Sequence, residues 1–400
     1  MQRVVITGRG VICSLGERLP DIRARMASDD GVFCRPDFDG EVVTCPVEDF
    51  DLTRHIGRWK HRRYLNRGAS LGLAAASMAL QESGIADSQR QEMGLFAGVG
   101  PHLDIAGTFA HIAHGVLDEQ GMEALWLLRF LPNTLAGAIA QRLGARGENL
   151  TVATACTASL QAIGEAWNRI RFGQLRQALA GGGDSRISSG GILGYKRADA
   201  LYRGEGPPAE ACRPFDSSRS GFICGEGGAF VVLESLESAQ ERGAAIYGEL
   251  TGYACTMDGL SLTAPDPLAC QAEVALRRSL ERAGDPVVDL VCAHGTGTPL
   301  NDAMEAELIG RVFGDRPLVT AFKSWIGHLS AASGAADLVL ALGCLESGQV
   351  PPVRNLHQPC HHGIRLSREF QPVAVEHLVV QNFGFGGQNA ALVVRAWNGR

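Results

Sequence analysis

Short stretches from the first half of the chain recur, in the same order, in the second half. Ala79–Gly84 matches Ser279–Gly284 half a chain length later in a chain of 400 residues, and an apolar run follows each. The Gly-Phe pairs at Gly221 and Gly384 both lead into apolar runs, and Val319–Lys323 with the small-residue segment after it repeats a strand-and-helix unit of the first half. Any one match could arise by chance, but three in one order indicate a duplicated chain of βαβ type.

The length of the chain agrees with two similar halves, because 400 residues exceed what one ordinary hydrophobic core holds. The 50 glycines occur singly or in short motifs at the ends of apolar runs, where they indicate tight turns and close backbone packing. The boundary should lie near residues 240–245. We therefore expect an N-terminal half over residues 1–242 and a C-terminal half over residues 243–400, each of α/β class.

The net charge of −6 gives no reason to expect nucleic acid or an anionic membrane as a partner. No apolar stretch approaches the ~20 residues of a membrane span, and Met1–Gly8 enter a strand-like run without a signal-peptide core. The 11 cysteines are odd in number, scattered and without a C-x-x-C pair, so they indicate neither a disulfide framework nor a cysteine zinc site. A reducing cytoplasm is the expected compartment.

Cys156 lies where a strand-like run passes into a helix-like one. The apolar, β-prone residues 150–153 precede it, and large apolar residues recur at helical spacing from Leu160 to Ile170. At such a junction, free backbone N–H groups and the positive end of the helix dipole stabilise a thiolate, the nucleophilic form of cysteine. The alternative is a buried structural cysteine, because free cysteine is among the most buried residue types.

Two histidines lie in separate turns of the second half. His294 ends an apolar run in a loop rich in glycine and threonine, at the rim where open α/β sheets build their sites. His328 precedes a small-residue helix over Ala331–Leu345, whose positive end should lower the pKa of the ring and keep it neutral. Lys323 could reach Asp337 if that helix turns back toward it. The alternatives are a satisfied loop or core histidine and a surface lysine.

A glycine-rich turn, N-F-G-F-G-G-Q-N, runs from Asn382 to Asn389. Its glycines would let a backbone N–H approach a reacting carbonyl, and Phe385 could swing to gate a pocket. Together with one cysteine and two histidines, this turn leaves two chemistries open. A cysteine hydrolase would use one histidine as the base for attack by water or an amine. A carbon–carbon bond-forming acyltransferase would use two neutral histidines to stabilise an enolate.

The densest basic stretch of this acidic chain runs from Arg54 to Arg67 and includes Lys60, Arg62 and Arg63. Such a run is either a solvated face or a docking site for an acidic partner. Both alternatives stay open from the residues alone.

Four ordered motifs resemble those of the elongating β-ketoacyl-acyl carrier protein synthases of the Cys-His-His kind. They are T-A-C-T-A-S around Cys156, H-G-T-G-T-P at His294, K-S-W-I-G-H from Lys323 to His328, and N-F-G-F-G-G from Asn382. Further matches run from V-V-I-T-G at the start to P-F-D-S-S-R-S-G-F shortly before the second half. The resemblance implies the thiolase fold, with duplicated α/β halves in a five-layered α-β-α-β-α arrangement.

The resemblance also implies roles for the reactive residues. Cys156 would accept the acyl group, while His294 and His328 would serve malonyl decarboxylation and condensation. Lys323 would order the His328 side of the site, with the carboxylate of Asp337 in the same network. These five residues are the predicted catalytic set.

The remaining site residues are likewise carried over from the resemblance. Backbone N–H groups of Cys156 and Phe385 would form the oxyanion hole, and Phe385 would gate the way from the entry tunnel to the acyl pocket. The substrate-binding set would be Thr296, Thr298, Tyr195 and Gly386.

The resemblance implies acyl carrier protein as the partner, with both substrates on its phosphopantetheine and with no other cofactor and no metal. Lys60, Arg62 and Arg63 would dock this acidic carrier. The chain would form a homodimer, or a heterodimer with a chain-length factor, with the acyl pocket partly across the interface. Residues 101–135, which would shape that pocket, match the family least.

We therefore predict a cytoplasmic acyltransferase that lengthens fatty acyl chains by decarboxylative Claisen condensation of the acyl group on Cys156 with malonyl-acyl carrier protein. The alternative is the catalytic subunit of a type II polyketide or aryl-polyene system; a non-enzymatic chain-length factor would lack Cys156. Three residues depart from the family. Asp337 replaces a glutamate, Trp325 replaces a smaller residue near the floor of the site, and Tyr195 replaces a phenylalanine of the acyl tunnel.

Overall fold

The computed structural model describes residues 1–103, 112–113, 116–117 and 124–399. Its large sheet contains two sets of strands. The first-half set comprises β1 (Val4–Ile12), β3 (Gly94–Gly98), β6 (Asn149–Val152), β7 (Gln177–Ser185) and β8 (Cys224–Ser235). The second-half set comprises β9 (Gly248–Met257), β10 (Leu290–Cys292), β11 (Leu318–Thr320), β13 (Arg365–Leu366), β15 (His377–Gly384) and β16 (Gln388–Arg395).

The strand order shows the duplication directly. Across the sheet, the first set runs β6-β3-β7-β8-β1 and the second runs β11-β10-β15-β16-β9, with β13 beyond β11. In both sets the first three of these strands are parallel, and the fourth is antiparallel to both of its neighbours. β1 and β9 join the sets through a short antiparallel pairing. The prediction of duplicated α/β halves is confirmed.

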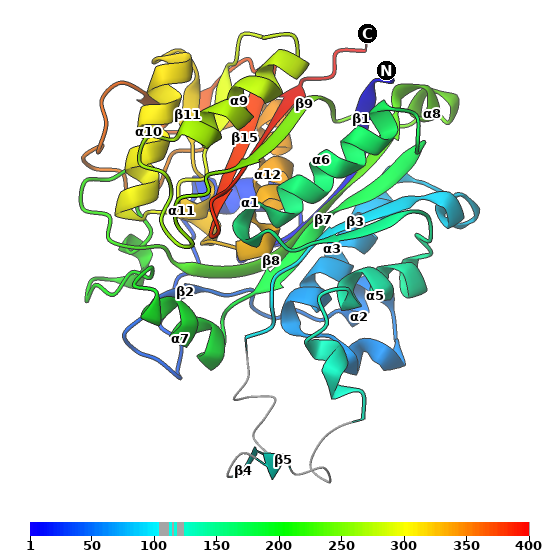
Figure 1. Ribbon diagram of the computed structural model, residues 1–400, viewed down its shortest axis with the longest axis horizontal. Helices are drawn as coiled ribbons and strands as arrows, with labels where there is room; N and C mark the ends of the chain where they lie inside the picture. The colour runs from blue at the N-terminus through cyan, green and yellow to red at the C-terminus, as the bar shows by residue number, and fades with distance from the viewer. Residues whose placement is uncertain (104–111, 114–115, 118–123, 400) are drawn as a thin grey trace.

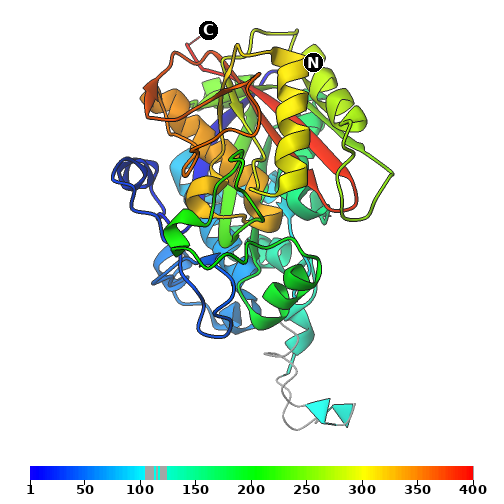
Figure 2. The ribbon, with the colours of Figure 1, turned by 90° about the vertical axis from the view of Figure 1, so that its left-hand side faces the viewer.

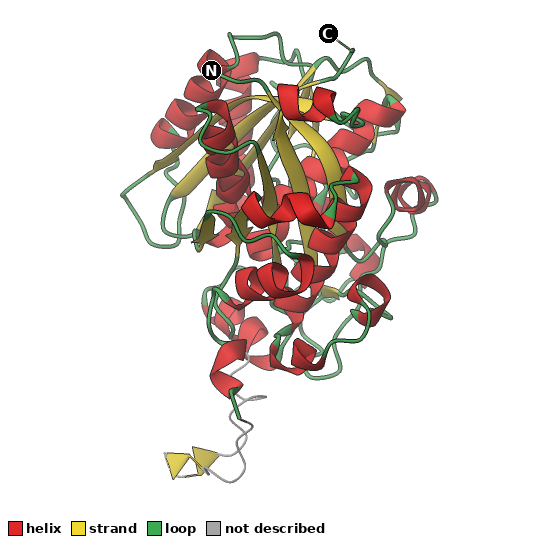
Figure 3. Cartoon of the chain, turned by 90° about the vertical axis from the view of Figure 1, so that its right-hand side faces the viewer, coloured by secondary structure: helices red, strands yellow, loops and turns green. Residues whose placement is uncertain are grey.

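Helices cover both faces of both sets, so that five layers result (Figures 1 and 3). α6 (Ala158–Arg171) and α12 (Ser333–Ser347) lie between the two sets and pack against each other. The other large helices cover the outer faces: α3 (Arg67–Ser83) and α5 (Thr134–Leu143) on the first set, α9 (Cys270–Arg282) and α10 (Pro299–Phe313) on the second.

Alternation along the strands explains why both faces are buried. In β8, Ala229, Val231 and Leu233 belong to the apolar core between the two sets, whereas Phe230 and Val232 belong to the core beneath α3 and α5. Successive side chains of a strand point to opposite faces, and here helices cover each face. The strand therefore reads as a continuous apolar run rather than as an alternating one.

Two glycines of β1 have a different meaning from the one their sequence suggests. Gly8-Arg9-Gly10 reads as the end of a strand begun at Val4, yet β1 continues to Ile12. A Cβ on Gly8 would lie 2.2 Å from the carbonyl oxygen of Ala79, and one on Gly10 would lie 2.0 Å from that of Ala75, both in α3. The glycines therefore mark the close approach of a helix and not a turn.

The remaining elements lie around this frame. The helices are α1 (Leu19–Ala27), α2 (Thr53–Ile56), α7 (Ser189–Arg197), α8 (Leu236–Glu241) and α11 (Lys323–Ile326), with single 3-10 turns at 60–64, 87–92, 126–129, 155–157, 208–210 and 330–332. The short strands are β2 (Thr44–Cys45), β4 (Ile112–Ala113), β5 (Val116–Leu117), β12 (Gln349–Val350) and β14 (Gln371–Pro372). Figure 2 shows α1 at one side of the molecule and both termini at the same end.

Local signals of the sequence mark the bounds of two helices. α1 has Pro20 in its first turn, and α5 ends before Gly144, which has a left-handed φ of +87°. Much of the segment 101–135, which matches the family least, lies outside the described residues. Within the described part of the chain, no helix has the length and apolar character needed to cross a membrane.

Candidate active site

Cys156 lies in a sharp turn between β6 and α6, as its sequence context predicts. The turn is a short 3-10 helix, Ala155–Thr157, in which Ala155 has a left-handed φ of +51°. Such a conformation costs a non-glycine residue free energy and is found at functional turns. A Cβ on Gly384, at the end of β15, would lie 3.1 Å from the backbone nitrogen of Cys156. The second half of the chain therefore closes directly over the cysteine of the first.

The resting protonation state of Cys156 differs from the thiolate that its place near a helix start suggests. Burial raises the pKa of the thiol to about 11, although the charges of Lys323 and Arg186 and the backbone N–H of Phe385 lower it. Removing the charged thiolate from water costs more free energy than the two charges and the N–H donor contribute. Cys156 is thus a thiol at neutral pH, and the thiolate must form when substrate arrives.

Two imidazoles approach the sulfur of Cys156. His328 Nε2 lies 3.1 Å from Cys156 Sγ, and the ring centroids of His294 and His328 are 5.3 Å apart at an interplanar angle of 87°. Burial lowers the pKa of both rings far below the ordinary value, and the charge of Lys323 adds to this effect on each. Both histidines are therefore neutral at pH 7, as predicted for His328. The cause is mainly burial and not the helix dipole.

Hydrogen bonds to the far side of each ring fix its tautomer. His328 Nδ1 accepts the backbone N–H of Ser330 at 3.3 Å and lies 2.8 Å from the hydroxyl of Ser333. His294 Nδ1 lies 3.0 Å from the amide nitrogen of Asn382, which also donates to Asp337 Oδ2 at 3.1 Å. A carboxylate oxygen accepts hydrogen bonds, so the Asn382 atom that faces Asp337 is the amide nitrogen and not the amide oxygen. The same nitrogen faces His294 Nδ1, which is therefore an acceptor as well. Each neutral ring then carries its proton on Nε2.

This tautomer decides what the cluster can bind. A nitrogen of each ring and Cys156 Sγ lie within 4.8 Å of one another, which is close enough to suggest three ligands of a metal ion. A ring nitrogen that binds a metal ion must be unprotonated, whereas the hydrogen bonds to Nδ1 favour a proton on each Nε2. The arrangement instead presents two N–H donors and one thiol to a single point, where a carbonyl oxygen that gains negative charge would be stabilised.

Lys323 and Asp337 form the buried pair behind the histidines. Lys323 Nζ donates to Asp337 Oδ2 at 2.7 Å, and both side chains are at most 2% exposed. α12 does turn back toward Lys323, so the shorter carboxylate of Asp337 reaches the network. Asp337 Oδ1 has no hydrogen-bond partner among the described residues.

A carboxylate also holds the backbone of the His294 loop. Glu305 in α10 accepts the backbone N–H groups of His294 at 2.6 Å and Gly295 at 2.7 Å, and the side-chain amides of Gln381 at 2.8 Å and Asn301 at 3.2 Å. Burial raises the pKa of Glu305 to about 7, while these donors oppose the shift. The four N–H donors favour the ionised carboxylate, whereas the charge of nearby Asp302 adds to the upward shift of the Glu305 pKa.

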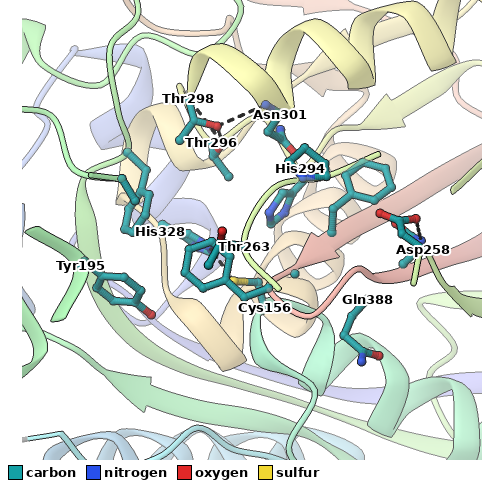
Figure 4. Close-up of a pocket in the computed structure, with 17 residues that line it drawn as sticks. Cys156, Tyr195, Asp258, Thr263, His294, Thr296, Thr298, Asn301, His328 and Gln388 are labelled. Carbon is teal, nitrogen blue, oxygen red and sulfur yellow. Dashed lines mark hydrogen bonds between the residues drawn. The ribbon is translucent and has the colours of Figure 1, made fainter. Parts of the chain in front are cut away.

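A cavity that is partly open to solvent leads to the three reactive side chains (Figure 4). Its wall includes four of the predicted substrate or gate residues: Tyr195, Thr296, Thr298 and Phe385. The Tyr195 hydroxyl lies 3.3 Å from Ser330 Oγ, which supplies the partner that a buried tyrosine needs. These four residues and the three reactive side chains thus lie around one opening.

Other predicted residues lie outside the wall of this cavity. The backbone N–H of Gly386 donates to the carbonyl of Leu262 at 2.8 Å, so this glycine holds the gate turn. The Trp325 indole, expected near the floor of the site, instead donates to the carbonyl of Pro352 at 2.8 Å. The predicted docking residues lie in or beside a 3-10 turn that contacts residues 126–129: Lys60, Arg62 and Arg63.

A second copy of the cysteine turn lies in the other half. Ser330–Ala332 precede α12 as Ala155–Thr157 precede α6, and Ser330 has a left-handed φ of +49°. Ala331 therefore stands where Cys156 stands in the first copy. Its backbone N–H donates to Asp184 Oδ2 at 3.1 Å, and that oxygen also accepts from the buried guanidinium of Arg186 at 2.9 Å.

Sequence reasoning missed several residues of the site. It gave no role to Asn382, although the glycine-rich motif begins with this residue, and it did not consider Asp184 or Asp258, of which Asp258 lines the cavity. Asn382 and Asp184 end strands that the duplication makes equivalent, β15 and β7. That equivalence is the signal that would have found them.

A thiol and two imidazoles held as N–H donors, on a duplicated five-layered α/β frame, define an acyl-transferring enzyme of the thiolase fold. Family models agree with this class: "Beta-ketoacyl synthase, N-terminal domain" matches residues 1–239, and "Beta-ketoacyl synthase, C-terminal domain" matches residues 247–357. The chain belongs to the β-ketoacyl synthase family.

Relatives match over the full length of the chain. The chain is 32% identical to "3-oxoacyl-[acyl-carrier-protein] synthase 2" of Synechocystis sp., over 99% of this chain and 98% of that protein. It is 33% identical to "Putative 3-oxoacyl-[acyl-carrier-protein] synthase, mitochondrial" of Schizosaccharomyces pombe, over 98% of each chain.

Solved structures are similar as well. A β-ketoacyl synthase from Burkholderia phymatum STM815 superposes with a TM-score of 0.92 at 28% identity, over 100% of both chains. A chain of "The ishigamide ketosynthase/chain length factor" superposes with a TM-score of 0.90 at 30% identity, over 99% of this chain and 100% of that chain.

Proposed function

We propose that this chain is an elongating β-ketoacyl-acyl carrier protein synthase. It lengthens an acyl group held on Cys156 by decarboxylative Claisen condensation with malonyl-acyl carrier protein. The observation that carries the proposal is the pair of neutral histidines, both held with the proton on Nε2, beside the thiol. Two donors at one point fit an enolate oxygen, whereas a hydrolase needs a ring nitrogen that accepts a proton from water.

The first step moves the acyl group onto Cys156. The sulfur attacks the acyl-thioester carbonyl, the bond to the carrier thiol breaks, and the proton of Cys156 ends on that thiol. The oxyanion formed on the way would accept the backbone N–H groups of Cys156 and Phe385; Gly384 lets this turn approach the Cys156 nitrogen closely. No net base is needed, because one thiol replaces another.

The second step releases carbon dioxide from malonyl-carrier. The carbon–carbon bond to the carboxylate breaks, and its electron pair forms an enolate whose oxygen accepts from Nε2–H of His294 and His328. The Lys323 charge favours this developing negative charge and keeps both rings neutral. The enolate carbon then attacks the acyl carbonyl on Cys156, the bond to sulfur breaks, and a β-ketoacyl group two carbons longer forms on the carrier. The Cys156 thiolate that leaves takes up a proton from solvent and becomes a thiol again.

Both substrates arrive on the phosphopantetheine of acyl carrier protein, and we expect no other cofactor and no metal. Thr296 and Thr298, on the cavity wall, would contact the arm, and Lys60, Arg62 and Arg63 would attract the acidic carrier. The edge strand β6 ends the sheet among the described residues, and Leu150 on it is 40% exposed. A second chain can extend the sheet there, which supports a dimer. The 11 free cysteines fit the reducing cytoplasm.

A ketosynthase subunit of a polyketide or aryl-polyene system is the second candidate. The likeness to a chain of the ishigamide ketosynthase/chain length factor and the hydroxyl pair of Tyr195 and Ser330 beside the cavity both favour it. Size-exclusion chromatography of the chain expressed alone separates the candidates. A soluble, active homodimer supports the first, and a chain that is inactive without a partner supports the second.

Intact-mass analysis after incubation with acyl-carrier tests the proposal. We expect the wild type to gain one acyl group and Cys156→Ala to gain none, and addition of malonyl-carrier should yield β-ketoacyl-carrier. An unmodified wild-type Cys156 would refute the nucleophile. Release of free acid as fast as condensation would instead show a hydrolase.

A further inference from the structure

A second cavity lies between α1 and α12, and among the described residues its wall shares none with the cavity that leads to Cys156. Six apolar side chains line this second cavity: Leu19, Ile22, Met26, Phe322, Leu340 and Phe370. They belong to the apolar core between the two sets of strands or pack against it, but Leu19 and Phe370 are only partly buried. This core is therefore open to solvent beside α1, at one side of the molecule (Figure 2).

The cavity follows the buried face of α1. Leu19, Ile22 and Met26 recur at helical spacing along this face, and at 1.5 Å per residue they span about 10 Å. Leu19 lies against α12, since a Cβ on Gly343 would lie 3.4 Å from Leu19 Cδ2. A slot of this length, walled by aliphatic and aromatic side chains, fits an alkyl chain.

One side of the cavity carries a cation without a partner. Two charged side chains line the wall, Arg23 and Glu346. Glu346 forms an ion pair with Arg9 at 3.1 Å, whereas the Arg23 side chain has no ion pair or hydrogen bond within the described part of the chain. Burial raises the pKa of the Cys344 thiol on the same wall to about 12, and the charge of Arg23 opposes this rise. The guanidinium charge therefore acts inside the cavity.

We propose that this cavity binds an aliphatic carboxylate with a single alkyl chain, of the fatty acid class. The chain would lie between α1 and α12, and the carboxylate would accept hydrogen bonds from the guanidinium of Arg23. Burial of the chain would supply most of the affinity, and the charge-assisted hydrogen bonds would fix its direction. A neutral chain of the same length would lose only the second contribution. The inference does not depend on the proposed function, because the cavity is separate from the one at Cys156.

Calorimetric titration with decanoate and with decanol tests the role of the cation. Arg23→Gln should weaken the binding of decanoate about three- to tenfold, because charge-assisted hydrogen bonds at a partly open site are lost. The affinity for decanol should change less than about twofold. Arg23 is exposed, so this variant should fold as the wild type does. Arg18→Gln is the matched control, because Arg18 lies beside the same helix, faces Asp21 at 3.9 Å and is not part of the wall; it should leave both affinities unchanged.

Filling the cavity tests the place of the chain. Ser347→Phe should weaken both ligands about tenfold or more, because the ring would occupy the space of the alkyl chain. Ser347→Ala removes the same hydrogen bond, from Ser347 Oγ to the carbonyl of Gly343 at 2.7 Å, without filling the cavity, and should bind as the wild type does. Decanoate that carries a diazirine at the chain end should label peptides from residues 19–26 or 340–347 on irradiation.

Three results would overturn the inference. A wild type that does not bind decanoate has no such site. Equal loss of decanoate and decanol in Arg23→Gln would show that Arg23 shapes the wall and does not hold a carboxylate. Photolabelling confined to the peptide that contains Cys156, with the affinity of Ser347→Phe unchanged, would place the acid in the active-site cavity instead.

Discussion

Asn382 offers the sharpest test of the two-donor arrangement. Its amide nitrogen lies between His294 Nδ1 at 3.0 Å and Asp337 Oδ2 at 3.1 Å, and among the described residues it makes no hydrogen bond to Cys156 or His328. Asn382→Ala removes the donor that keeps the His294 proton on Nε2. The substitution adds no bulk. This matters because the side chain of Asn382 is tightly packed against Gly334, where an added Cβ would lie only 2.4 Å from Asn382 Oδ1.

The expected size of the effect follows from one hydrogen bond. A buried neutral hydrogen bond contributes about 0.5–1.5 kcal/mol net, and leaving its partners unsatisfied raises the cost to about 1–3 kcal/mol. If the Nε2–H tautomer loses about 1–2 kcal/mol of its preference, decarboxylation slows about 5- to 30-fold. Acylation of Cys156 depends on the His328 side of the site, so it should change less than about threefold.

Two assays separate these steps. Intact mass at short times follows acylation of Cys156, and carbon dioxide release from malonyl-carrier follows decarboxylation. Thr320→Val is the control, because it removes one buried hydrogen bond, from Thr320 Oγ1 to the carbonyl of Pro351 at 2.9 Å, away from the histidines. Equal loss of both steps in Asn382→Ala, or no loss of either, would refute a role in setting the tautomer of His294.

Three further predictions concern single groups of the site. In the folded chain the pKa of His294 and of His328 lies below the unfolded value of about 6.5, so only the unfolded chain takes up these two protons as pH falls. The free energy of unfolding, measured with urea, should therefore drop by up to about 2.7 kcal/mol per pH unit below pH 6.5. A His294→Asn/His328→Asn variant should lose less stability per pH unit over the same range. Glu305→Gln should cost about 2–4 kcal/mol in the same measurement, because an amide NH₂ would face N–H donors; wild-type stability would show that Glu305 is protonated instead. Tyr195→Phe should raise kcat/KM for a saturated acyl group about two- to fivefold by removing a hydroxyl held only by a 3.3 Å contact, and a fall would show that the hydroxyl is needed.

The fold could be predicted from the sequence to the extent that its signals are local or repeated. The matches of Ala79–Gly84 with Ser279–Gly284 and of the two Gly-Phe segments correspond to α3 with α9 and to β8 with β16, which occupy equivalent places. Glycine misled where its role is tertiary. Gly8 and Gly10 resemble a turn, yet they admit α3 against β1, and only the packed structure shows that this helix lies against them.

The site could be predicted by residue type but not by protonation. The motifs predict one common site for four side chains, those of Cys156, His294, His328 and Lys323. The thiolate expected at Cys156 is absent because burial, which a sequence does not show, outweighs a helix end. The histidine tautomers depend on Asn382 and on backbone N–H groups that come from distant segments, so no local pattern reveals them.

The second cysteine-like turn has a consequence for how the oxyanion hole is understood. There the backbone N–H of Ala331 already holds a negatively charged oxygen, that of Asp184, at 3.1 Å. The two copies of the turn thus differ in their surroundings. A carboxylate of the chain lies against the turn at Ala331, whereas the glycine turn at Gly384 lies beside the Cys156 nitrogen, where the proposed mechanism would place a substrate oxygen. The Asp184 carboxylate at Ala331 thus occupies the place that, at the Cys156 turn, a short-lived oxyanion of the substrate would occupy in the proposed mechanism. Catalysis and architecture then use the same backbone geometry, and the halves differ in whether the anion is covalently part of the chain.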